Sequence, residues 1–230
     1  MGSKVTRFRK GDNVVTLFNQ GHLSGPLNKK TILTGLGGTL DGTLRQYGVF
    51  SEDGLVEMPP SLSWLEASTL SCAALTSWNA LYGLKPLVPG QVVLTQGTGG
   101  VSLFSVQFAK AAGAKVIATT SSARKCKILK NLGADHIINY NEIAEWGKEA
   151  KNLTPNGDGA DHVVEVGGPG TMAQSLEAVK IDGVISIIGF LAEAEKKQPS
   201  FLEILNRIII VRGALVGSRM QFEEMASVSL

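Results

Sequence analysis

The sequence is poor in cysteine, in long apolar runs and in aromatic residues, and the first two shortages each exclude a class of protein. Its 230 residues include two cysteines, Cys72 and Cys126, too few for a disulfide framework or a four-cysteine zinc site. No segment approaches the roughly 18 apolar residues of a membrane-spanning helix. Residues 1–12 lack the apolar stretch of a signal peptide, so a reducing cytoplasm is the expected location.

The charge is also small. The formal net charge is +2, and no run of five or more like charges occurs. That balance argues against nucleic acid or an anionic membrane as a partner. With 43% apolar and 18% charged residues, the chain is expected to be a soluble globular protein rather than a disordered one.

The stretch between residues 91 and 113 is the most informative part of the sequence for fold and function. Residues 91–96 form a short β-branched apolar run, which indicates a strand buried on both faces. A glycine turn follows, and helical spacing of apolar residues then continues up to Gly113. Gly97 would allow the tight turn, and Gly99 would let the backbone approach a pyrophosphate at the helix N-terminus. Ser102 replaces the third fingerprint glycine, which is tolerable if the helix packs slightly further from the strand. The expected pyrophosphate-binding residues are Gly97, Thr98, Gly99, Gly100 and Val101. The alternative is an ordinary strand–turn–helix joint without a ligand.

Strand and helix patterns alternate after this stretch. We expect strands at residues 91–96, 115–120, 136–139, 160–166, 184–188 and 207–216. Helical patterns between them cover residues 101–112, 123–132, 142–153, 171–180 and 199–205. Such alternation with short connections predicts an α/β fold, a doubly wound parallel sheet of the Rossmann type.

Residues 1–60 look different, being rich in glycine and loops. Strands are expected at residues 13–18 and 42–50, and Ser63 with Glu66 predicts a capping box at the start of a helix. Two short strands cannot close a barrel, so this segment is expected to be part of a small β domain.

Several motifs in order resemble the medium-chain dehydrogenase/reductase superfamily, and in particular its zinc-free, quinone-oxidoreductase-like branch. They are Lys10-Gly11-Asp12, Gly42-Thr43 with Gln46-Tyr47, the segment 70–78, the fingerprint helix, and the segments 132–140 and 161–168. The resemblance implies a partial GroES-like catalytic domain at residues 1–72 and a dinucleotide-binding Rossmann domain at residues 73–230. It also implies that the chain is truncated at both ends relative to the family.

The residues after the second strand bear on the choice of cofactor. An NAD-specific site places an acid there, whereas residues 119–122 read Thr-Thr-Ser-Ser. Arg124 and Lys125 follow in the first turn of a helix, where cations cost roughly a few tenths of a kcal/mol unless an anion lies nearby. A 2′-phosphate held by Ser121, Ser122 and Lys125 would be that anion, which favours NADP(H). The alternative is a solvated helix face.

The resemblance adds further cofactor contacts. In NADPH-dependent quinone reductases a lysine and a tyrosine hold the 2′-phosphate, and Lys125 and Tyr140 stand at the similar positions. The remaining expected contacts are Thr76 near the nicotinamide, Val166 and Gly167 after the fourth strand, and Ile188, Gly189 and Phe190 after the fifth.

No metal site and no general acid can be named from the sequence. Cys72 lies where zinc-dependent relatives carry a ligand, but catalytic zinc needs three protein ligands, so a structural thiol is expected. His22, His136 and His162 are scattered. In the zinc-free branch, catalysis rests on holding hydride donor and acceptor together.

The expected function is hydride transfer between NADP(H) and a quinone, an enone or an alcohol/carbonyl substrate. The alternative is a nucleotide-binding or regulatory oxidoreductase-like protein without turnover. The apolar strand at residues 207–216 would lie at a sheet edge, and the family forms dimers near this end of the cofactor domain. We therefore expect a homodimer through this edge.

Overall fold

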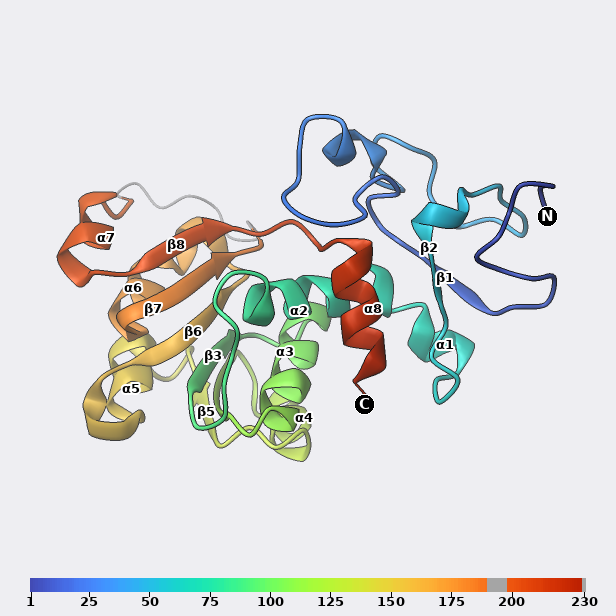
Figure 1. Ribbon diagram of the computed structural model, residues 1–230. Coiled ribbons are helices and arrows are strands. Elements are labelled where there is room, and N and C mark those ends of the chain that lie inside the picture. The colour runs from blue at the N-terminus through green and yellow to red at the C-terminus, as the bar shows by residue number, and fades with distance from the viewer. Residues whose placement is uncertain (190–197, 229–230) are drawn as a thin grey trace. The chain divides into compact units, whose positions relative to one another are not determined.

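The computed structural model describes residues 1–189 and 198–228. The chain packs as two compact units (Figure 1). One unit contains Met1–Asn79 and Val216–Leu230, and the other contains Ala80–Leu215. The boundary at residues 72 and 73, drawn from motifs, stays a prediction.

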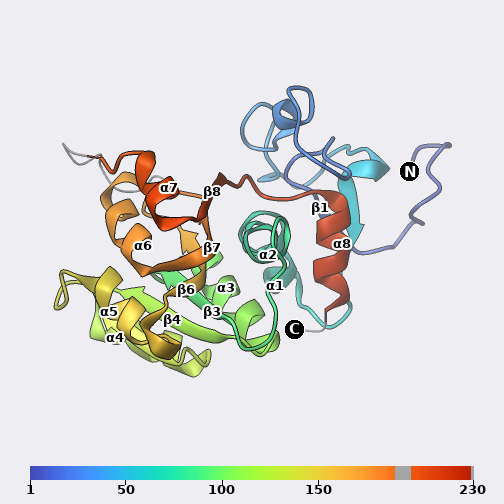
Figure 2. The same ribbon diagram turned by 60° about the vertical axis from the view of Figure 1, so that its left-hand side comes forward.

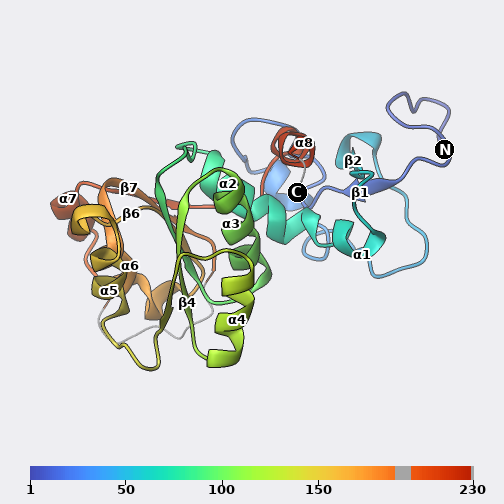
Figure 3. The same ribbon diagram turned by 90° about the horizontal axis from the view of Figure 1, so that it is seen from below.

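The unit of residues 80–215 is built on a parallel sheet of six strands in the order β5-β4-β3-β6-β7-β8. The strands are β3 (Val92–Gln96), β4 (Lys115–Thr120), β5 (His136–Asn139), β6 (Ala160–Glu165), β7 (Val179–Ile187) and β8 (Ile210–Gly213). The helices between them are α3 (Gly100–Ala111), α4 (Ala123–Asn131), α5 (Trp146–Asn152), α6 (Met172–Ala178) and α7 (Leu202–Arg207). Helices α3 and α4 cover one face, and α5 and α6 cover the other (Figure 3). The predicted doubly wound Rossmann fold is confirmed.

The core of this unit explains why the central strand is apolar on both sides. All five residues of β3 are buried, because β3 lies between β4 and β6 and is covered on both faces. Leu94, Ile117, Val163 and Ile185 belong to a single buried cluster with Trp146 of α5. Alternate residues of the strands therefore meet helices on opposite faces.

Several element boundaries differ from the sequence prediction. The strand expected at residues 207–216 is shorter, because Arg207 is still helical and forms ion pairs with Glu177 at 3.0 Å and Glu203 at 3.4 Å. Ile208 then takes a left-handed conformation, with φ of 53°, and ends α7. The strand β7 begins at Val179, inside the helix expected at residues 171–180, since α6 ends at Ala178.

The other unit contains an antiparallel pair, β1 (Val14–Thr16) and β2 (Leu55–Glu57), with Val15 opposite Val56. The strand expected at residues 42–50 is wrong. Leu44, Tyr47 and Val49 are each at least nine-tenths exposed, and these residues join no ladder in the part of the chain that the structure describes. A short 3-10 turn at Glu52–Gly54 instead returns the chain so that β2 pairs with β1.

Helices complete this unit (Figure 2). The predicted capping box is confirmed: Ser63 accepts from the backbone N–H of Glu66, whose side chain accepts from the N–H of Ser63, at the start of α1 (Trp64–Ala67). The helix α2 (Leu75–Tyr82) follows a π-helical turn at Leu70–Ala74. Within residues 1–189 and 198–228, no helix is long and apolar enough to cross a bilayer.

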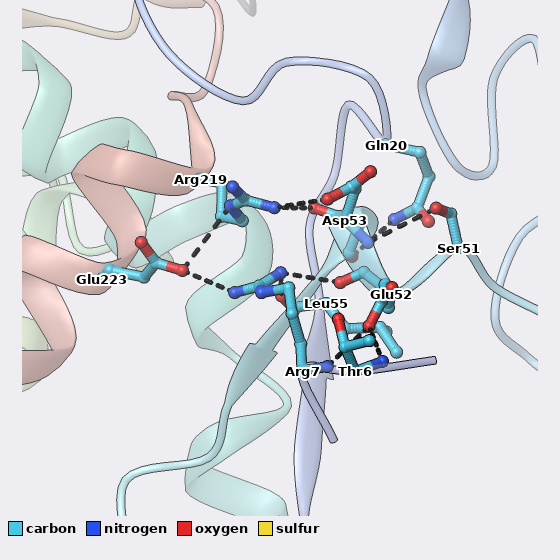
Figure 4. A network of polar contacts seen from close by, with 10 residues as sticks. Thr6, Arg7, Gln20, Ser51, Glu52, Asp53, Leu55, Arg219 and Glu223 are labelled. Atoms are coloured by element: carbon cyan, nitrogen blue, oxygen red, sulfur yellow. Dashed lines mark hydrogen bonds and ion pairs between the residues drawn. The ribbon is translucent and has the colours of Figure 1, made fainter. Parts of the chain in front are cut away.

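The helix α8 (Arg219–Ser227) packs with the N-terminal residues, although it is far from them in sequence. Its Phe222 and Met225 are 0% and 1% exposed. Figure 4 shows the charged contacts beside it: Arg7 pairs with Glu223 at 2.8 Å, and Arg219 pairs with Asp53 at 3.0 Å. Exposed ion pairs contribute little, about 0–1 kcal/mol each, so the buried apolar side chains hold α8 in place and the pairs set its orientation.

The side chain of His162 is buried in the sheet at a cost in folding free energy. His162 of β6 is 2% exposed, and neither ring nitrogen has a hydrogen-bond partner within the described residues. Burial lowers the pKa of His162 to about 4 from an ordinary 6.5; Lys85 and Arg212 act in the same direction, while Asp161 opposes them. His162 is therefore neutral in the folded protein at neutral pH.

This depressed pKa predicts acid sensitivity. Below pH 6.5 His162 becomes protonated in the unfolded chain, whereas in the folded protein it stays neutral until about pH 4. Stability is therefore lost as the pH falls from 6.5 to about 4. The full loss amounts to about 3 kcal/mol. Denaturant titrations from pH 7.5 to 4 should show this decline, and His162→Leu should flatten it. His136→Gln, at an exposed position, is the control that should leave the decline in place; a decline unchanged in His162→Leu would contradict the assignment.

Candidate functional site

A cleft of about 950 Å³ opens at the carboxyl ends of the strands in the unit of residues 80–215. In an open parallel sheet this edge is where ligands bind, because loops from several strands converge there. Eleven residues expected from the sequence line it: Gly97, Thr98, Gly99, Gly100, Val101, Lys125, Tyr140, Val166, Gly167, Ile188 and Gly189. The sequence prediction missed eight other lining residues: Gln96, Ser102, Thr119, Ala144, Trp146, Gly170, Thr171 and Gln174.

The glycine turn between β3 and α3 forms one wall of the cleft. Gly97 has a φ of 72°, a left-handed conformation that favours glycine, and its N–H donates to the carbonyl of Thr119 at 2.8 Å. Gly99 has an ordinary φ of −76°, and a Cβ placed on it would meet no atom of the described residues within 4 Å. Gly99 is also the N-cap of α3, so no side chain caps the first turn. The backbone N–H groups of the first turn of α3 and the helix dipole therefore face the cleft, an arrangement that suits an anion.

Ser102 takes the place of a third glycine and makes a specific contact. Its side chain is 1% exposed, and its hydroxyl donates to the carbonyl of Gln96, the last residue of β3, at 2.6 Å. The serine thus ties the first turn of α3 to the strand by a hydrogen bond. The sequence prediction had treated Ser102 only as a tolerated departure from glycine.

The cations after β4 separate into two kinds. Lys125 lines the cleft together with Tyr140, which follows β5, whereas Arg124 is exposed and is not among the lining residues. Neither serine of the expected phosphate site lines the cleft. Ser122 is the N-cap of α4 and accepts from the N–H of Lys125 at 3.4 Å, and the carbonyl of Ser121 accepts from Asn141 at 2.9 Å.

The ends of β6 and β7 form the opposite wall. Gly189 packs so closely that a Cβ there would lie 2.1 Å from the carbonyl oxygen of Val166. The N–H of Ile188 donates to the carbonyl of Glu165 at 2.8 Å. Phe190, also expected at the cofactor, lies outside the described residues.

Behind this wall lies a buried pair that the sequence prediction missed. Gln96 and Glu165 are 5% and 0% exposed, and the Nε2 of Gln96 donates to the Oε2 of Glu165 at 2.8 Å. A charged residue at the buried end of a strand, directly after two valines, was the available signal, because an ionisable side chain in a buried strand needs partners. Its partner Gln96 comes from a strand about seventy residues away in sequence, which no local pattern reveals.

Thr76 and Cys72 lie in the other compact unit. Thr76 is 3% exposed, and its hydroxyl donates to the carbonyl of Cys72 at 2.6 Å, which is a local helix contact. Desolvation raises the pKa of the Cys72 thiol, which disfavours the thiolate that zinc requires. Among residues 1–189 and 198–228, no three side chains of His, Cys, Asp or Glu gather as a metal site. The described residues therefore do not fit a zinc ion.

Known proteins resemble this chain along its whole length. A model described as zinc-binding dehydrogenase matches residues 100–229. A zinc-type alcohol dehydrogenase-like protein of Schizosaccharomyces pombe is 44% identical over 99% of this chain and 67% of its own length.

Solved structures agree with that similarity. A protein of Sinorhizobium meliloti 1021 assigned as an alcohol dehydrogenase has a TM-score of 0.89 and 44% identity over 98% of this chain and 66% of its own. A structure described as an NAD-dependent alcohol dehydrogenase has a TM-score of 0.83 and 31% identity, over 96% of this chain and 66% of its own. The chain spans about two thirds of the length of these proteins.

The open space at Gly99 predicts a sharp separation between folding and binding. Gly99→Ala and Gly99→Val should both fold normally, because the protein leaves room for a Cβ and the φ is ordinary. A side chain there would occupy the space that a pyrophosphate needs. The affinity for NADPH and NADH should therefore fall in Gly99→Ala and be abolished in Gly99→Val. Circular dichroism and nucleotide fluorescence titration measure the two effects. Full affinity in a folded Gly99→Val protein would contradict the anion site.

Proposed function

Because the chain belongs to the zinc-binding dehydrogenase family, within the medium-chain dehydrogenase/reductase superfamily, we propose that it is an oxidoreductase that binds NADP(H) in the cleft of residues 80–215. The observation that carries the proposal is the turn at Gly97–Gly100. It presents the uncapped start of α3 to the cleft and leaves the space above Gly99 free. Among the described residues, no atom lies within 4 Å of the position that a Cβ on Gly99 would take.

The preference for NADP(H) over NAD(H) follows from the charges at the end of β4. Lys125 lines the cleft near Tyr140, and residues 119–122 supply no carboxylate for a ribose 2′-hydroxyl. A 2′-phosphate would neutralise Lys125, whereas an unmodified ribose would leave that cation unpaired beside the start of α4. The alternative preference for NAD(H) is represented by the similar NAD-dependent alcohol dehydrogenase.

The proposed reaction is hydride transfer to or from a quinone, an enone or an alcohol/carbonyl substrate. The nicotinamide ring supplies or accepts the hydride when the cofactor is bound. The residues of this chain contribute binding and orientation: backbone N–H groups of the first turn of α3 for the pyrophosphate, and the loops after β6 and β7 for the opposite wall. We place this activity in a reducing cytoplasm, in keeping with two free cysteines.

The second proposal is a nucleotide-binding protein without turnover, because the cleft lining accounts for binding of a nucleotide but includes no residue to which a catalytic role is assigned. Two measurements separate it from an enzyme. Fluorescence titration with NADPH tests binding, and loss of NADPH absorbance in the presence of a quinone, an enone or an aldehyde tests turnover. Binding without turnover over all three acceptors supports the second proposal, and turnover with one of them supports the first.

We also propose that the chain forms a homodimer through β8. This strand lies at the end of the sheet order and pairs only with β7 among the described residues. Ile208 and Ile210 beside its free edge are 60% and 42% exposed. An apolar edge strand offers unpaired N–H and C=O groups, which a second copy can satisfy by symmetric pairing.

The charge of Lys125 predicts the cofactor preference. Lys125→Glu should weaken NADPH binding by about 1–3 kcal/mol, since a charge-assisted contact becomes a repulsion, and should leave NADH affinity within about twofold. Arg124→Glu is the matched control: it makes the same charge change one residue away, outside the cleft lining, and should have a much smaller effect. Tighter binding of NADH than NADPH by the unmodified chain would overturn the NADP(H) preference.

The free edge of β8 predicts which backbone group a dimer needs. The N–H of Ala214 donates to Ile187 of β7 at 2.9 Å, so alternation directs the N–H of Gly213 away from β7. Gly213→Pro should therefore raise the dimer dissociation constant at least about tenfold, since each lost hydrogen bond is worth about 1 kcal/mol and symmetry doubles the loss. Gly213→Ala keeps the N–H and should self-associate like the unmodified chain. Analytical ultracentrifugation decides, and a monomeric unmodified chain at high concentration would refute the dimer.

A further inference from the structure

The two walls of the cleft are connected from behind by the buried pair of Gln96 and Glu165. Gln96 is the last residue of β3, directly before the glycine turn, and Glu165 is the last residue of β6, directly before the loop of residues 166–171. Their side chains meet at 2.8 Å across the junction of the two strands. The pair therefore joins the two segments that face each other across the cleft.

The carboxylate of Glu165 divides its contacts between the loop and the core. Its Oε1 accepts from the backbone N–H groups of Gly167 and Gly168, at 2.9 Å each, and from the hydroxyl of Thr171 at 2.5 Å. Its Oε2 accepts from Gln96 and from the hydroxyl of Ser175 in α6. One oxygen thus fixes the loop, and the other fixes the strand and helix behind it.

Gln96 completes the connection with its own oxygen. Its Oε1 accepts from the N–H groups of Val166 and Gly167 at 3.2 Å each, while its Nε2 also donates to Ser175 at 2.7 Å. The first three backbone N–H groups after β6 are therefore all held by these two side chains. The loop has one defined position relative to β3, and the glycine turn begins at the residue after Gln96.

A purely packing role would not require this polarity. Burying a carboxylate and an amide costs free energy unless every group is satisfied, and apolar side chains of similar volume fill cores without that cost. Directional hydrogen bonds do what apolar contacts cannot, which is to set the position of a loop that has no side chain at residues 167 and 168. The cleft is lined by parts of both segments: Gly97–Val101 on one side, and Val166, Gly167, Gly170 and Thr171 on the other.

We propose that Gln96 and Glu165 are positioning residues that set the width of the nucleotide cleft by holding the loop of residues 166–171 against the end of β3. Neither side chain needs to donate to the nucleotide for this role. The inference rests on the proposed function, since it concerns the same cleft. It assigns to two buried side chains a role in cofactor affinity that is separate from their contribution to stability.

The direction of the hydrogen bonds makes the proposal testable by exchange. In Glu165→Gln an amide NH₂ must point either at the N–H groups of Gly167 and Gly168 or at the NH₂ of Gln96, and both arrangements set donor against donor. In the double variant Gln96→Glu/Glu165→Gln, the new amide can donate to the new carboxylate while its oxygen accepts from the loop. The carboxylate at residue 96 still accepts from Val166 and Gly167, and Ser175 can reverse its hydroxyl.

The experiment compares four proteins, each titrated with NADPH and NADH by fluorescence and melted without nucleotide. Glu165→Gln should lose about tenfold to a hundredfold in nucleotide affinity, because the loop of residues 166–171 would no longer be held in its position at the cleft. The exchange rates of the Gly167 and Gly168 amide protons should also rise. The double variant should recover most of the affinity. Ser175→Ala removes a contact to a residue of α6 that does not itself line the cleft, so it should lower the melting temperature and keep affinity within about twofold.

Each result has a defined meaning. Two results would overturn the positioning role while leaving the proposed function intact. One is unchanged nucleotide affinity in Glu165→Gln. The other is a double variant that melts at the same temperature as the unmodified protein but binds nucleotide as weakly as Glu165→Gln. An unmodified chain that binds neither nucleotide would overturn the proposed function itself. If Glu165→Gln does not fold, Thr171→Val, which removes one loop contact to Oε1, takes its place and should weaken affinity more than Ser175→Ala does.

Discussion

The end of β3 is the point on which the cleft depends. This strand is buried on both faces between β4 and β6, and at Gly97 it must turn at once into α3, whose first turn faces the cleft. Three polar contacts fix that point: the N–H of Gly97 on Thr119, the hydroxyl of Ser102 on Gln96, and the side chain of Gln96 on Glu165. The turn is therefore held to both neighbouring strands and to its own helix. A ligand meets a surface whose shape is set before it binds.

Much of the fold could be predicted because its signals are local. A β-branched run, a glycine turn and helical spacing follow one another at residues 91–113, and the alternation after them gives the parallel sheet. The strand expected at residues 42–50 failed for a reason that is not local. Strand formation depends on a neighbouring strand as much as on propensity, and in the described part of the chain these residues pair with none. The 3-10 turn at Glu52–Gly54, capped by Ser51, leads instead into β2, which is the strand that pairs with β1.

The site was predictable where it consists of backbone and unpredictable where it consists of contacts between side chains. The spacing of the glycines indicated their role, whereas Gln96 and Glu165 lie about seventy residues apart and meet only because β3 and β6 are neighbours. Arg124 and Lys125 show the same limit on a smaller scale. Both are cations in the same helical turn, yet only Lys125 lines the cleft, and sequence composition cannot distinguish adjacent positions of a helix whose rotation is set by packing.

Three glycines of the cleft differ in what makes them necessary, and the difference bears on function. Gly97 is required by its left-handed φ of 72°, and Gly189 by a carbonyl oxygen that would lie 2.1 Å from its Cβ. Both are explained by the fold alone. Gly99 has neither constraint, since its φ is ordinary and, in the part of the chain that the structure describes, no atom lies within 4 Å of the position of a Cβ. A glycine within the start of a helix costs about 0.5–1 kcal/mol relative to alanine, although at the N-cap itself glycine is nearly neutral. The protein thus has no packing reason to exclude a side chain at Gly99, and the space it leaves open is the space that an anion at the N-terminus of α3 would fill.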